Sequence, residues 1–218
     1  MNQFNFNIKN TFCISLLSNK NRCEKMQKRF KELNIDVTIF PASTPNDIKN
    51  NCAHYLNIFQ KACAQSHFNI WKHILTNNLE YALILEDDAC FDKKFFEKIN
   101  TFTLDVNDKN WHAIFLNASE SLKIQNKWVL CDEQYLCGGY ILSQKGCQIL
   151  IHMYYNCLHA ADWMTTRLQK YNHCYSYFPW LIIQEGIETT IGSGVEEDHK
   201  KVVRLLEEID YSLDNYNI

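Results

Sequence analysis

The chain has 218 residues, of which 46% are hydrophobic and 22% charged, and this balance excludes an intrinsically disordered protein. The formal net charge is −3, so no basic excess indicates a nucleic-acid partner or an anionic membrane surface. No apolar stretch approaches the ~20 residues that span a bilayer, and Met1-Asn2-Gln3-Phe4-Asn5 lacks the basic and apolar regions of a signal peptide. We therefore expect a soluble protein, cytoplasmic or facing the cytosol, with one domain over residues 1–218. The sequence carries no signal for an oligomeric state.

Ten cysteines are scattered along the chain without a Cys-x-x-Cys pair, which argues against a structural zinc site. Several lie within apolar runs or stripes, as Cys13 and Cys63 do, where a free thiol packs as a small hydrophobic group. The expectation is therefore reduced, buried thiols in a reducing compartment.

The first predicted unit is strand, helix, strand. Residues 11–17 form an apolar run that predicts a strand, and Ser18-Asn19 offers a cap for a helix over 22–33, where apolar residues recur at helical spacing. Residues 37–40 predict a second strand. This order is the opening unit of an α/β fold.

A long helix and a buried strand follow a polar loop over residues 43–56. The helix is predicted from about Asn57 to Leu75, because its apolar residues recur at offsets of three and four. Residues 81–85, Tyr-Ala-Leu-Ile-Leu, then form a nearly continuous apolar strand, typical of a strand with helices on both faces. The strand ends abruptly in Glu86-Asp87-Asp88.

The second half of the chain continues with alternating elements. Asp92 is expected to cap a helix that carries Phe95, Phe96 and Ile99. Further strands are expected over 111–116, 128–131 and 135–142 (interrupted by Gly138-Gly139), and helices over 144–156, 161–171 and 195–213. Residues 175–183 are apolar and broken by Pro179. The predicted fold class is α/β, with a Rossmann-like, mostly parallel central sheet flanked by helices.

Three consecutive carboxylates directly after a buried strand are the sharpest chemical signal. Ligands of parallel α/β sheets sit beyond the carboxyl ends of the strands, and strand geometry puts Glu86 and Asp88 on one face and Asp87 on the other. A divalent cation relieves the repulsion among such charges, and oxygen-rich sites suit Mn²⁺ or Mg²⁺ shared with substrate phosphates. The alternative is a solvated acidic turn that caps the next helix. Taken alone, the cluster fits transferase, phosphatase or nuclease chemistry.

Five motifs in the same order carry a resemblance to a known family over residues 11–191. They are Ile14-Ser15-Leu16 with Asn21-Arg22 and Met26; Cys63-Ala64-Gln65-Ser66-His67 with Trp71; the segment Leu79 to Asp88; Gly139-Tyr140-Ile141-Leu142-Ser143 with Gly146; and Ile182-Ile183-Gln184. The chain resembles glycosyltransferase family 25, the lipooligosaccharide galactosyltransferases and their collagen hydroxylysine galactosyltransferase relatives. Asp162 also lies where this family has an acidic residue.

The resemblance implies a GT-A type fold and an inverting transfer of a hexose from a UDP-sugar to a hydroxyl of a glycan or protein acceptor. Galactose or glucose is favoured by analogy alone. The resemblance also implies Mn²⁺ (or Mg²⁺), with Glu86-Asp87-Asp88 in place of the family's Asp-x-Asp motif. Asp88 and Glu86 are then the expected metal ligands, and Glu86 and Asp87 the expected donor contacts.

The other candidate residues each have a structural alternative. Asp162 is the candidate general base for the acceptor hydroxyl, and a helix cap is its alternative. Further donor contacts are expected from Arg22, Ser66, His67, Gly139 and Gln184. Each has a structural alternative: Arg22 could be a surface arginine at a helix start, Ser66 a packed serine and His67 a core histidine. Gly139 could form a strand bulge, and Gln184 could be a glutamine at a strand edge. The tryptophans Trp71, Trp163 and Trp180 are expected in the core rather than stacked on sugar.

Two departures from the family pattern leave other functions open. Ala42-Ser43-Thr44-Pro45 stands where the family commonly has Asp-Gly, and Ala62 stands where it has glycine. The first departure motivates the alternative of a catalytically degenerate nucleotide-sugar-binding protein on the same fold. A phosphate-ester hydrolase is less favoured, because no His-x-His or Asp-x-His-like run supplies a two-metal site. Lids or acceptor loops are expected within 43–56, 117–127 and 186–200.

Overall fold

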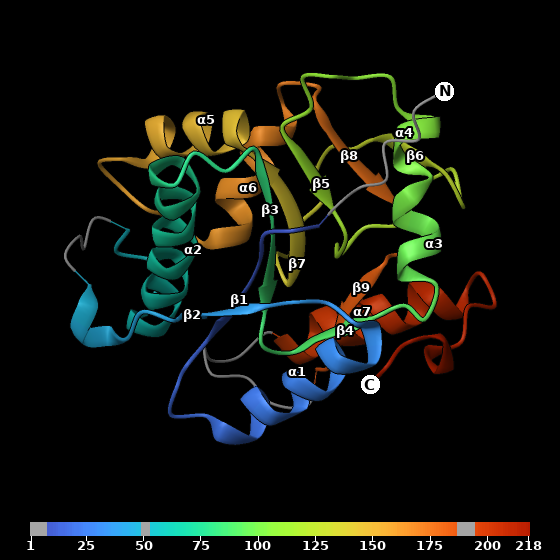
Figure 1. Cartoon of the computed structure of the whole chain (residues 1–218), viewed down its shortest axis with the longest axis horizontal. Coiled ribbons are helices and arrows are strands. Elements are labelled where there is room, and N and C mark those ends of the chain that lie inside the picture. Colours follow the sequence, from blue (N-terminus) through green and yellow to red (C-terminus); the bar gives the residue numbers. More distant parts are fainter. Residues whose placement is uncertain (1–7, 49–52, 187–194) are drawn as a thin grey trace.

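A central sheet organises the protein, whose computed structural model describes residues 8–48, 53–186 and 195–218 (Figure 1). Within these residues the sheet has seven strands in the order β2-β1-β3-β7-β5-β8-β6. They are β1 (Thr11–Ser15), β2 (Thr38–Pro41), β3 (Tyr81–Glu86), β5 (Ala113–Phe115), β6 (Trp128–Leu130), β7 (Gly139–Ser143) and β8 (Cys174–Tyr177). Only β6 and β7 run against the other five strands. The expected α/β class with a mostly parallel sheet is confirmed.

Helices cover both faces of this sheet, as Figure 1 shows. The helices α2 (Ile58–Thr76), α5 (Gln144–Tyr154) and α6 (Ala161–Gln169) share one buried cluster with the sheet. The helices α1 (Lys20–Leu33), α3 (Phe95–Asn100) and α4 (Phe102–Asp105) share a second cluster on the other face. A third, smaller cluster lies under α7 (Val195–Glu207). These layers agree with the GT-A type of architecture that the resemblance implies.

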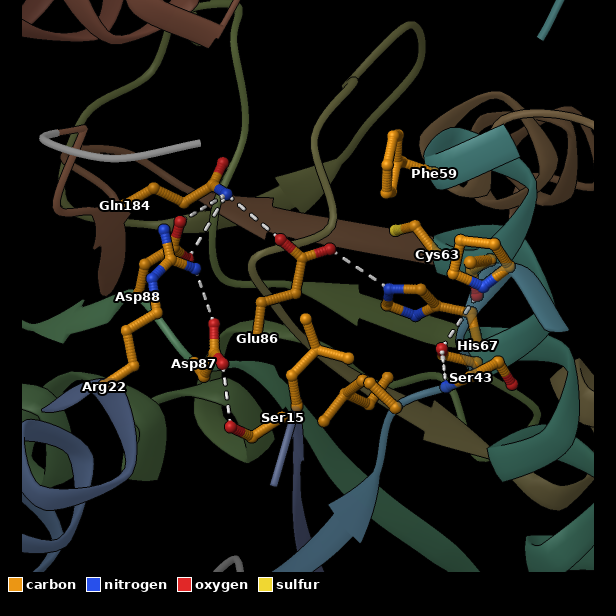
Figure 2. A pocket seen from close by; sticks show the side chains of 16 residues that line it. Ser15, Arg22, Ser43, Phe59, Cys63, His67, Glu86, Asp87, Asp88 and Gln184 are labelled. Atoms are coloured by element: carbon orange, nitrogen blue, oxygen red, sulfur yellow. Dashed lines mark hydrogen bonds and ion pairs between the residues drawn. The ribbon is translucent and has the colours of Figure 1, made fainter. Parts of the chain in front are cut away.

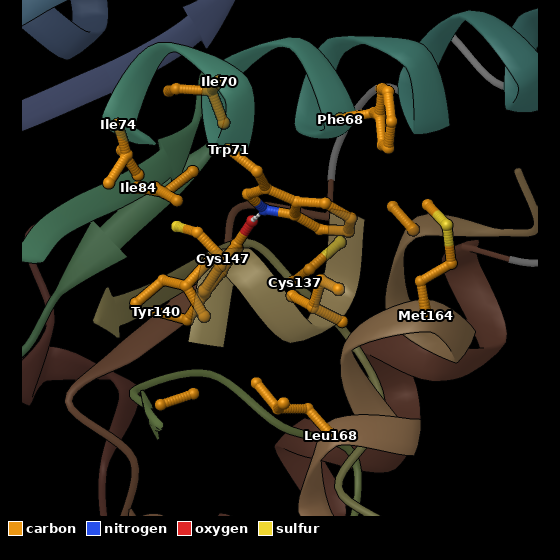
Figure 3. Close-up of a cluster of buried hydrophobic side chains, with 14 of the residues drawn as sticks. Phe68, Ile70, Trp71, Ile74, Ile84, Cys137, Tyr140, Cys147, Met164 and Leu168 are labelled. Atoms are coloured by element: carbon orange, nitrogen blue, oxygen red, sulfur yellow. Dashed lines mark hydrogen bonds between the residues drawn. The ribbon is translucent and has the colours of Figure 1, made fainter. Parts of the chain in front are cut away.

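The apolar sequence of β3 follows from this double cover. Ala82 and Ile84 belong to the α2 side, where Figure 3 shows Ile84 below Trp71 and Ile74, whereas Leu83 and Leu85 belong to the α1 side. All four β3 residues are 0% exposed. Because successive strand residues point to opposite faces, two covered faces require an unbroken apolar run. The strand becomes polar where the cover ends, at Glu86.

A short two-stranded sheet, which the sequence does not predict, lies at the end of β3. It pairs β4 (Ala89–Phe91) antiparallel with β9 (Ile182–Gln184), with Ala89 opposite Gln184. Glu185 donates its N–H to the carbonyl of Asp88 at 2.9 Å and extends this pairing. The small sheet therefore brings Gln184 to the acidic triplet from nearly one hundred residues away.

Capping residues account for the predicted helix starts. Asn19 accepts the N–H of Arg22 at the start of α1, and Ser143 accepts the N–H of Gly146 at the start of α5. Asn57 and Gln60 form a capping box at the start of α2. These contacts place the beginnings of all three helices within two residues of the predicted positions.

Several expected elements are shorter in the structure, and three of them show the largest or clearest differences. The strand expected over 135–142 begins only at Gly139, because Leu136 has φ 75° and breaks the extended backbone. The helix expected over 195–213 ends at Glu207. Asp210, three residues later, takes a left-handed φ of 54°, and a 3₁₀ turn, η2 (Leu213–Asn215), follows. The strand expected over 111–116 is limited to β5.

The loops between elements also depart from expectation in detail. The polar loop 43–56 contains a 3₁₀ turn, η1 (Pro45–Asp47). Asp92 accepts the N–H of Lys94 just before α3, as a cap does, but it is also fully buried and pairs with Lys98 Nζ at 2.6 Å. Parts of the expected loops, residues 49–52 and 187–194, lie outside the described residues.

The cysteines largely follow the expectation of free thiols. Eight are free: Cys13, Cys23, Cys63, Cys90, Cys131, Cys137, Cys147 and Cys174. Cys157 is disulfide-bonded, which corrects the expectation of uniformly reduced thiols; scattered spacing does not reveal which sulfurs the fold brings together. Cys52 lies outside the described residues. Among the helices described, none has the length and apolarity needed to cross a bilayer.

Candidate functional site

The acidic triplet lies at the carboxyl edge of the sheet, on the wall of a cavity of about 390 Å³ (Figure 2). Because β1 and β3 are parallel neighbours with Ile14 opposite Glu86, both strands end at this edge. Ser15, the last residue of β1, therefore lies beside the triplet. The other walls come from the start of α1, the loop after β2 and the first turns of α2.

Asp87 is held by the protein on both of its carboxylate oxygens. Arg22 Nη1 lies 2.7 Å from Oδ1, and the Ser15 hydroxyl donates to Oδ2 at 2.7 Å. The side chains of Asp87 and Arg22 are only 12% and 11% exposed. The expected donor contact Arg22 is thus placed in the cavity wall by an ion pair with Asp87.

Glu86 and Asp88 point away from Asp87 and converge on one amide group. Gln184 Nε2 lies 3.1 Å from Oε2 of Glu86 and 3.4 and 3.5 Å from the two oxygens of Asp88. The alternation of strand geometry predicts this division of the triplet. Consequently the three carboxylates do not meet at one point: two face Gln184, and the third faces Arg22.

The two converging carboxylates differ in protonation. The pKa of Asp88 is raised to about 7, first by burial and then by the charge of Glu86, against the opposing charge of Arg22. Burial also works to raise the pKa of Glu86, but the hydrogen bonds from His67 and Cys137 and the charge of Arg22 act against it, and that pKa is lowered. The pair therefore combines an ionised Glu86 with an Asp88 that titrates near neutrality.

This donor set fits a hard divalent cation. The carboxylates of Glu86 and Asp88 offer oxygen ligands on either side of the Gln184 amide nitrogen, and the pKa of Asp88 is raised first by burial and then by the charge of Glu86. A cation at Glu86 and Asp88 would remove that repulsion. Asp87 is already compensated by Arg22 and adds no free charge.

His67 lies behind Glu86 in a buried hydrogen-bond chain. Its Nε2 is 3.1 Å from Glu86 Oε1, and its Nδ1 is 2.9 Å from the Tyr140 hydroxyl, which also accepts the indole N–H of Trp71 at 2.9 Å (Figure 3). Because Tyr140 accepts from Trp71, its own hydrogen is available for Nδ1. We assign the Nε2–H tautomer, in which His67 donates to Glu86. The imidazole is 0% exposed, as the core alternative predicts, yet it also orients the carboxylate.

A second cavity of about 210 Å³ meets the first at Cys63, Glu86 and Gln184. Asp162, in the first turn of α6, lines it together with Asn117. Burial raises the pKa of Asp162, against the effect of the Trp163 N–H, which it accepts at 2.8 Å. Asp162 therefore faces the cavity, whereas the helix-cap alternative is wrong, because Ala160 is the N-cap of α6 and no side chain caps this helix.

Two expected donor residues have their groups engaged elsewhere. Ser66 donates to the carbonyl of Ala62 and accepts the N–H of Ser43, each at 2.8 Å, so it ties the loop after β2 to α2. Gly139 is paired with Leu85 in the sheet and is not among the described residues that line either cavity. A Cβ at Gly139 would lie 2.5 Å from Ile182, so glycine is needed there for packing.

The structure adds residues for which sequence reasoning gave no role. Ser15 holds Asp87, Tyr140 orients His67, and Asn117, which is 0% exposed, accepts the N–H of Gly138 at 3.0 Å. The position of Ser15 at the end of a strand next to β3 could have signalled its part. Cys137 lies 3.3 Å from Glu86, and no spacing in the sequence indicates that contact.

Trp163 differs from the other tryptophans considered for sugar contact. Trp71 and Trp180 are 0% exposed, as expected, whereas Trp163 is 52% exposed, so its expected place in the core is wrong. A nine-residue helix buries only one face, and Trp163 lies on the open face next to Asp162. The ring of Tyr55, itself exposed, lies 6.1 Å from it.

Comparisons with known proteins identify the family. The family described as glycosyltransferase family 25 (LPS biosynthesis protein) matches residues 8–165. Procollagen galactosyltransferase 1-B of Xenopus laevis is 26% identical over 65% of this chain and 28% of its own length, and a putative glycosyltransferase of Haemophilus influenzae is 27% identical over 66% and 57%. The chain thus spans from about a quarter to just over half of these relatives.

A solved glycosyltransferase involved in the glycosylation of the major capsid of PBCV-1 superposes with a TM-score of 0.44 and 11% identity, over 89% of this chain and 98% of that one. The family match extends from before β1 to the first turn of α6 and so includes the acidic triplet, His67 and Asp162. The chain belongs to glycosyltransferase family 25.

Proposed function

We propose that the chain is an inverting glycosyltransferase that moves a hexose from a UDP-sugar to a hydroxyl of a glycan or protein acceptor, with a divalent metal. The observation that carries this proposal is the convergence of Glu86 and Asp88 on Gln184 where two cavities meet. One cavity then receives the donor and the other the acceptor. A transfer reaction needs two such adjoining sites, whereas hydrolysis needs one substrate cavity and water.

The larger cavity is suited to the nucleotide diphosphate. Glu86 and Asp88 would hold Mn²⁺ or Mg²⁺, which supplies Lewis-acid neutralisation of the charge on the leaving diphosphate. The Arg22 guanidinium lies in the same wall, fixed by Asp87, and adds a cationic group for phosphate oxygens. The far wall offers apolar groups for the nucleoside, among them the exposed ring of Phe59.

The smaller cavity is suited to the acceptor hydroxyl. Asp162 faces it, and the raised pKa makes its carboxylate a stronger base than an ordinary aspartate. Trp163, the neighbour of Asp162 in the chain, and Tyr55 offer two exposed rings on which the C–H face of a sugar can pack. We assign Asp162 as the general base and this aromatic pair as part of the acceptor surface.

The sugar and the pathway are proposed from the relatives. Procollagen galactosyltransferases among them favour galactose, with glucose as the second choice, and the family description favours glycan assembly for lipopolysaccharide or glycoprotein. A catalytically degenerate nucleotide-sugar-binding protein is the alternative. It is motivated by Ala42 to Pro45, where the family pattern is lost on the wall of the larger cavity.

The deciding experiment measures UDP release from UDP-galactose and UDP-glucose with Mn²⁺, with and without a mixture of glycan and hydroxylysine-peptide acceptors. Thermal shift with each nucleotide sugar first identifies the donor that binds. We expect acceptor-stimulated UDP release that Asp162→Ala abolishes. A donor that stabilises the protein without any release would instead support the degenerate binder.

A further inference from the structure

Four side chains that can ligate a soft metal lie on the inner side of Glu86, in two groups of three that share His67 and Glu86. Cys63, His67 and Glu86 each offer one ligand atom, and these atoms lie within 4.8 Å of one another. Cys137 Sγ lies 3.3 Å from Oε1 of Glu86 and 3.7 Å from Nε2 of His67. We call these four residues the thiol cluster. They come from α2, from the end of β3 and from the loop before β7, so no Cys-x-x-Cys spacing marks them.

The distances resemble one face of a tetrahedral zinc site. Zinc bonds of about 2.3 Å to sulfur and 2.0–2.2 Å to nitrogen or oxygen put neighbouring ligand atoms about 3.4–3.6 Å apart. In the thiol cluster the corresponding separations are 3.1 Å from His67 to Glu86, 3.3 Å from Cys137 to Glu86 and 3.7 Å from Cys137 to His67. Cys63 is the candidate for the fourth corner: its Sγ lies within 4.8 Å of the ligand atoms of His67 and Glu86, and a side-chain movement must bring it into bonding distance.

The surroundings orient the ligands as an outer shell does in zinc proteins. Tyr140 holds Nδ1 of His67, which directs Nε2 into the cluster, and Trp71 in turn holds Tyr140. On metal binding the hydrogen moves from Nε2 to Nδ1, and the Tyr140 oxygen accepts it alongside the indole N–H. Both thiols release a proton, so the bound ion replaces protons within the cluster.

Glu86 separates this cluster from the oxygen ligands of the donor site. Its Oε1 faces the thiol cluster, whereas its Oε2 faces Gln184, the amide shared with Asp88. Thiolate and imidazole ligands select soft or borderline ions, whereas carboxylates and amide oxygens suit Mn²⁺ or Mg²⁺. The two sides of one glutamate therefore differ in the metal they prefer.

We propose that Cys63, Cys137, His67 and Glu86 bind a soft divalent cation of the Zn²⁺ type, and that this ion inhibits transfer by withdrawing Glu86 from the donor site. The inhibition rests on the proposed function; the binding does not. The cation is held at the junction of the two cavities, since Cys63 and Glu86 line both.

The binding is tested with Co²⁺ as the probe, on the reduced, metal-free protein without any sugar nucleotide. A thiolate-to-cobalt charge-transfer band and tetrahedral visible bands should appear at one equivalent and disappear when Zn²⁺ is added. Cys63→Ala and Cys137→Ala should each weaken cobalt binding about tenfold or more. Cys147→Ala is the matched control, because it removes a buried thiol from the same core outside the cluster and should leave the bands unchanged.

The absence of charge-transfer bands from the wild type, or bands that survive equally in both cluster variants, would overturn the metal site. Circular dichroism of each variant before metal addition establishes that it is folded. The inhibition is tested by adding Zn²⁺ to the UDP-release assay at saturating Mn²⁺, where Cys137→Ala should resist it. Equal inhibition of wild type and Cys137→Ala would overturn that part. If no UDP-sugar is turned over, the proposed function fails while the cobalt spectrum still decides the metal site.

Discussion

His67 and Glu86 join the middle of α2 to the end of β3 through a hydrogen bond of 3.1 Å. The imidazole is enclosed, and its other nitrogen is fixed by Tyr140, so the carboxylate of Glu86 has one defined orientation at the junction of the two cavities. The precision of the site therefore depends on a chain of side chains that begins in the core, at Trp71.

Tyr140→Phe tests this chain directly. The substitution leaves the indole N–H of Trp71 without its acceptor and removes the donor to Nδ1 of His67, so we expect a loss of about 1–3 kcal/mol in the free energy of unfolding. Turnover should fall more than stability explains, because His67 no longer holds Glu86 in one orientation. Denaturant unfolding and UDP release measure the two effects. Unchanged turnover in a destabilised variant would restrict Tyr140 to a packing role.

Asp88→Asn tests the cation site. The amide removes an anionic ligand, and we expect the affinity for UDP in the presence of Mn²⁺ to fall about tenfold or more. Affinity without metal should change little. Isothermal titration with and without Mn²⁺ measures both. Asp132→Asn is the matched control, since that carboxylate lies in an exposed pair with Lys170. If wild-type UDP affinity does not depend on Mn²⁺, the metal role of Asp88 is wrong.

The same substitution predicts a pH-dependent change in stability. Burial raises the pKa of Asp88 to about 7 from an ordinary value of 3.8, so its contribution to stability is complete below the lower value and is lost as pH rises through the higher one. Asp88→Asn removes this loss. The free energy of unfolding of the variant, relative to that of the wild type, should therefore rise by roughly 2–3 kcal/mol between about pH 5 and pH 8, at 1.36 kcal/mol per pKa unit.

Thermal unfolding in chelator checks this pH dependence, because added Mn²⁺ would stabilise the wild-type carboxylate and mask the effect. A constant difference between variant and wild type across that range would show that Asp88 does not titrate there.

Asp162→Asn separates catalysis from a local structural role. Asparagine can accept the same N–H of Trp163, so the free energy of unfolding should change little. An amide cannot take the acceptor proton, and turnover should fall by about 10²–10⁴-fold. UDP binding should persist. The measurement is UDP release with acceptor beside a thermal melt. A fully active variant would remove Asp162 from the mechanism.

The sequence predicted the order of most elements because local signals specify them. Asn19, Asn57 and Ser143 cap helices where expected, and β3 shows the apolar run of a doubly covered strand. It did not predict β4, since three residues carry too little pattern, although this strand is what aligns Gln184 with Asp88.

The sequence identified the acidic triplet, but it predicted only in part how the three carboxylates are directed to different partners. Strand alternation predicts that Asp87 faces away, yet nothing local reveals that Ser15 and Arg22 bind it. Those partners depend on the pairing of β1 with β3, which is a long-range contact. The contacts of Cys137 with His67 and Glu86 are hidden for the same reason.

Trp163→Ala tests the acceptor surface. The indole is exposed beside Asp162 and packs near Tyr55, so its removal should raise the KM for the acceptor about tenfold, the equivalent of ~1.4 kcal/mol, while the KM for the donor stays the same. Stability should change little because half of the side chain is already in solvent. Tyr155→Ala removes another exposed aromatic ring and serves as the control. Steady-state kinetics with each substrate varied in turn gives the KM for the acceptor and the KM for the donor separately. An equal rise in both KM values, or a raised acceptor KM in Tyr155→Ala as well, would place the acceptor elsewhere.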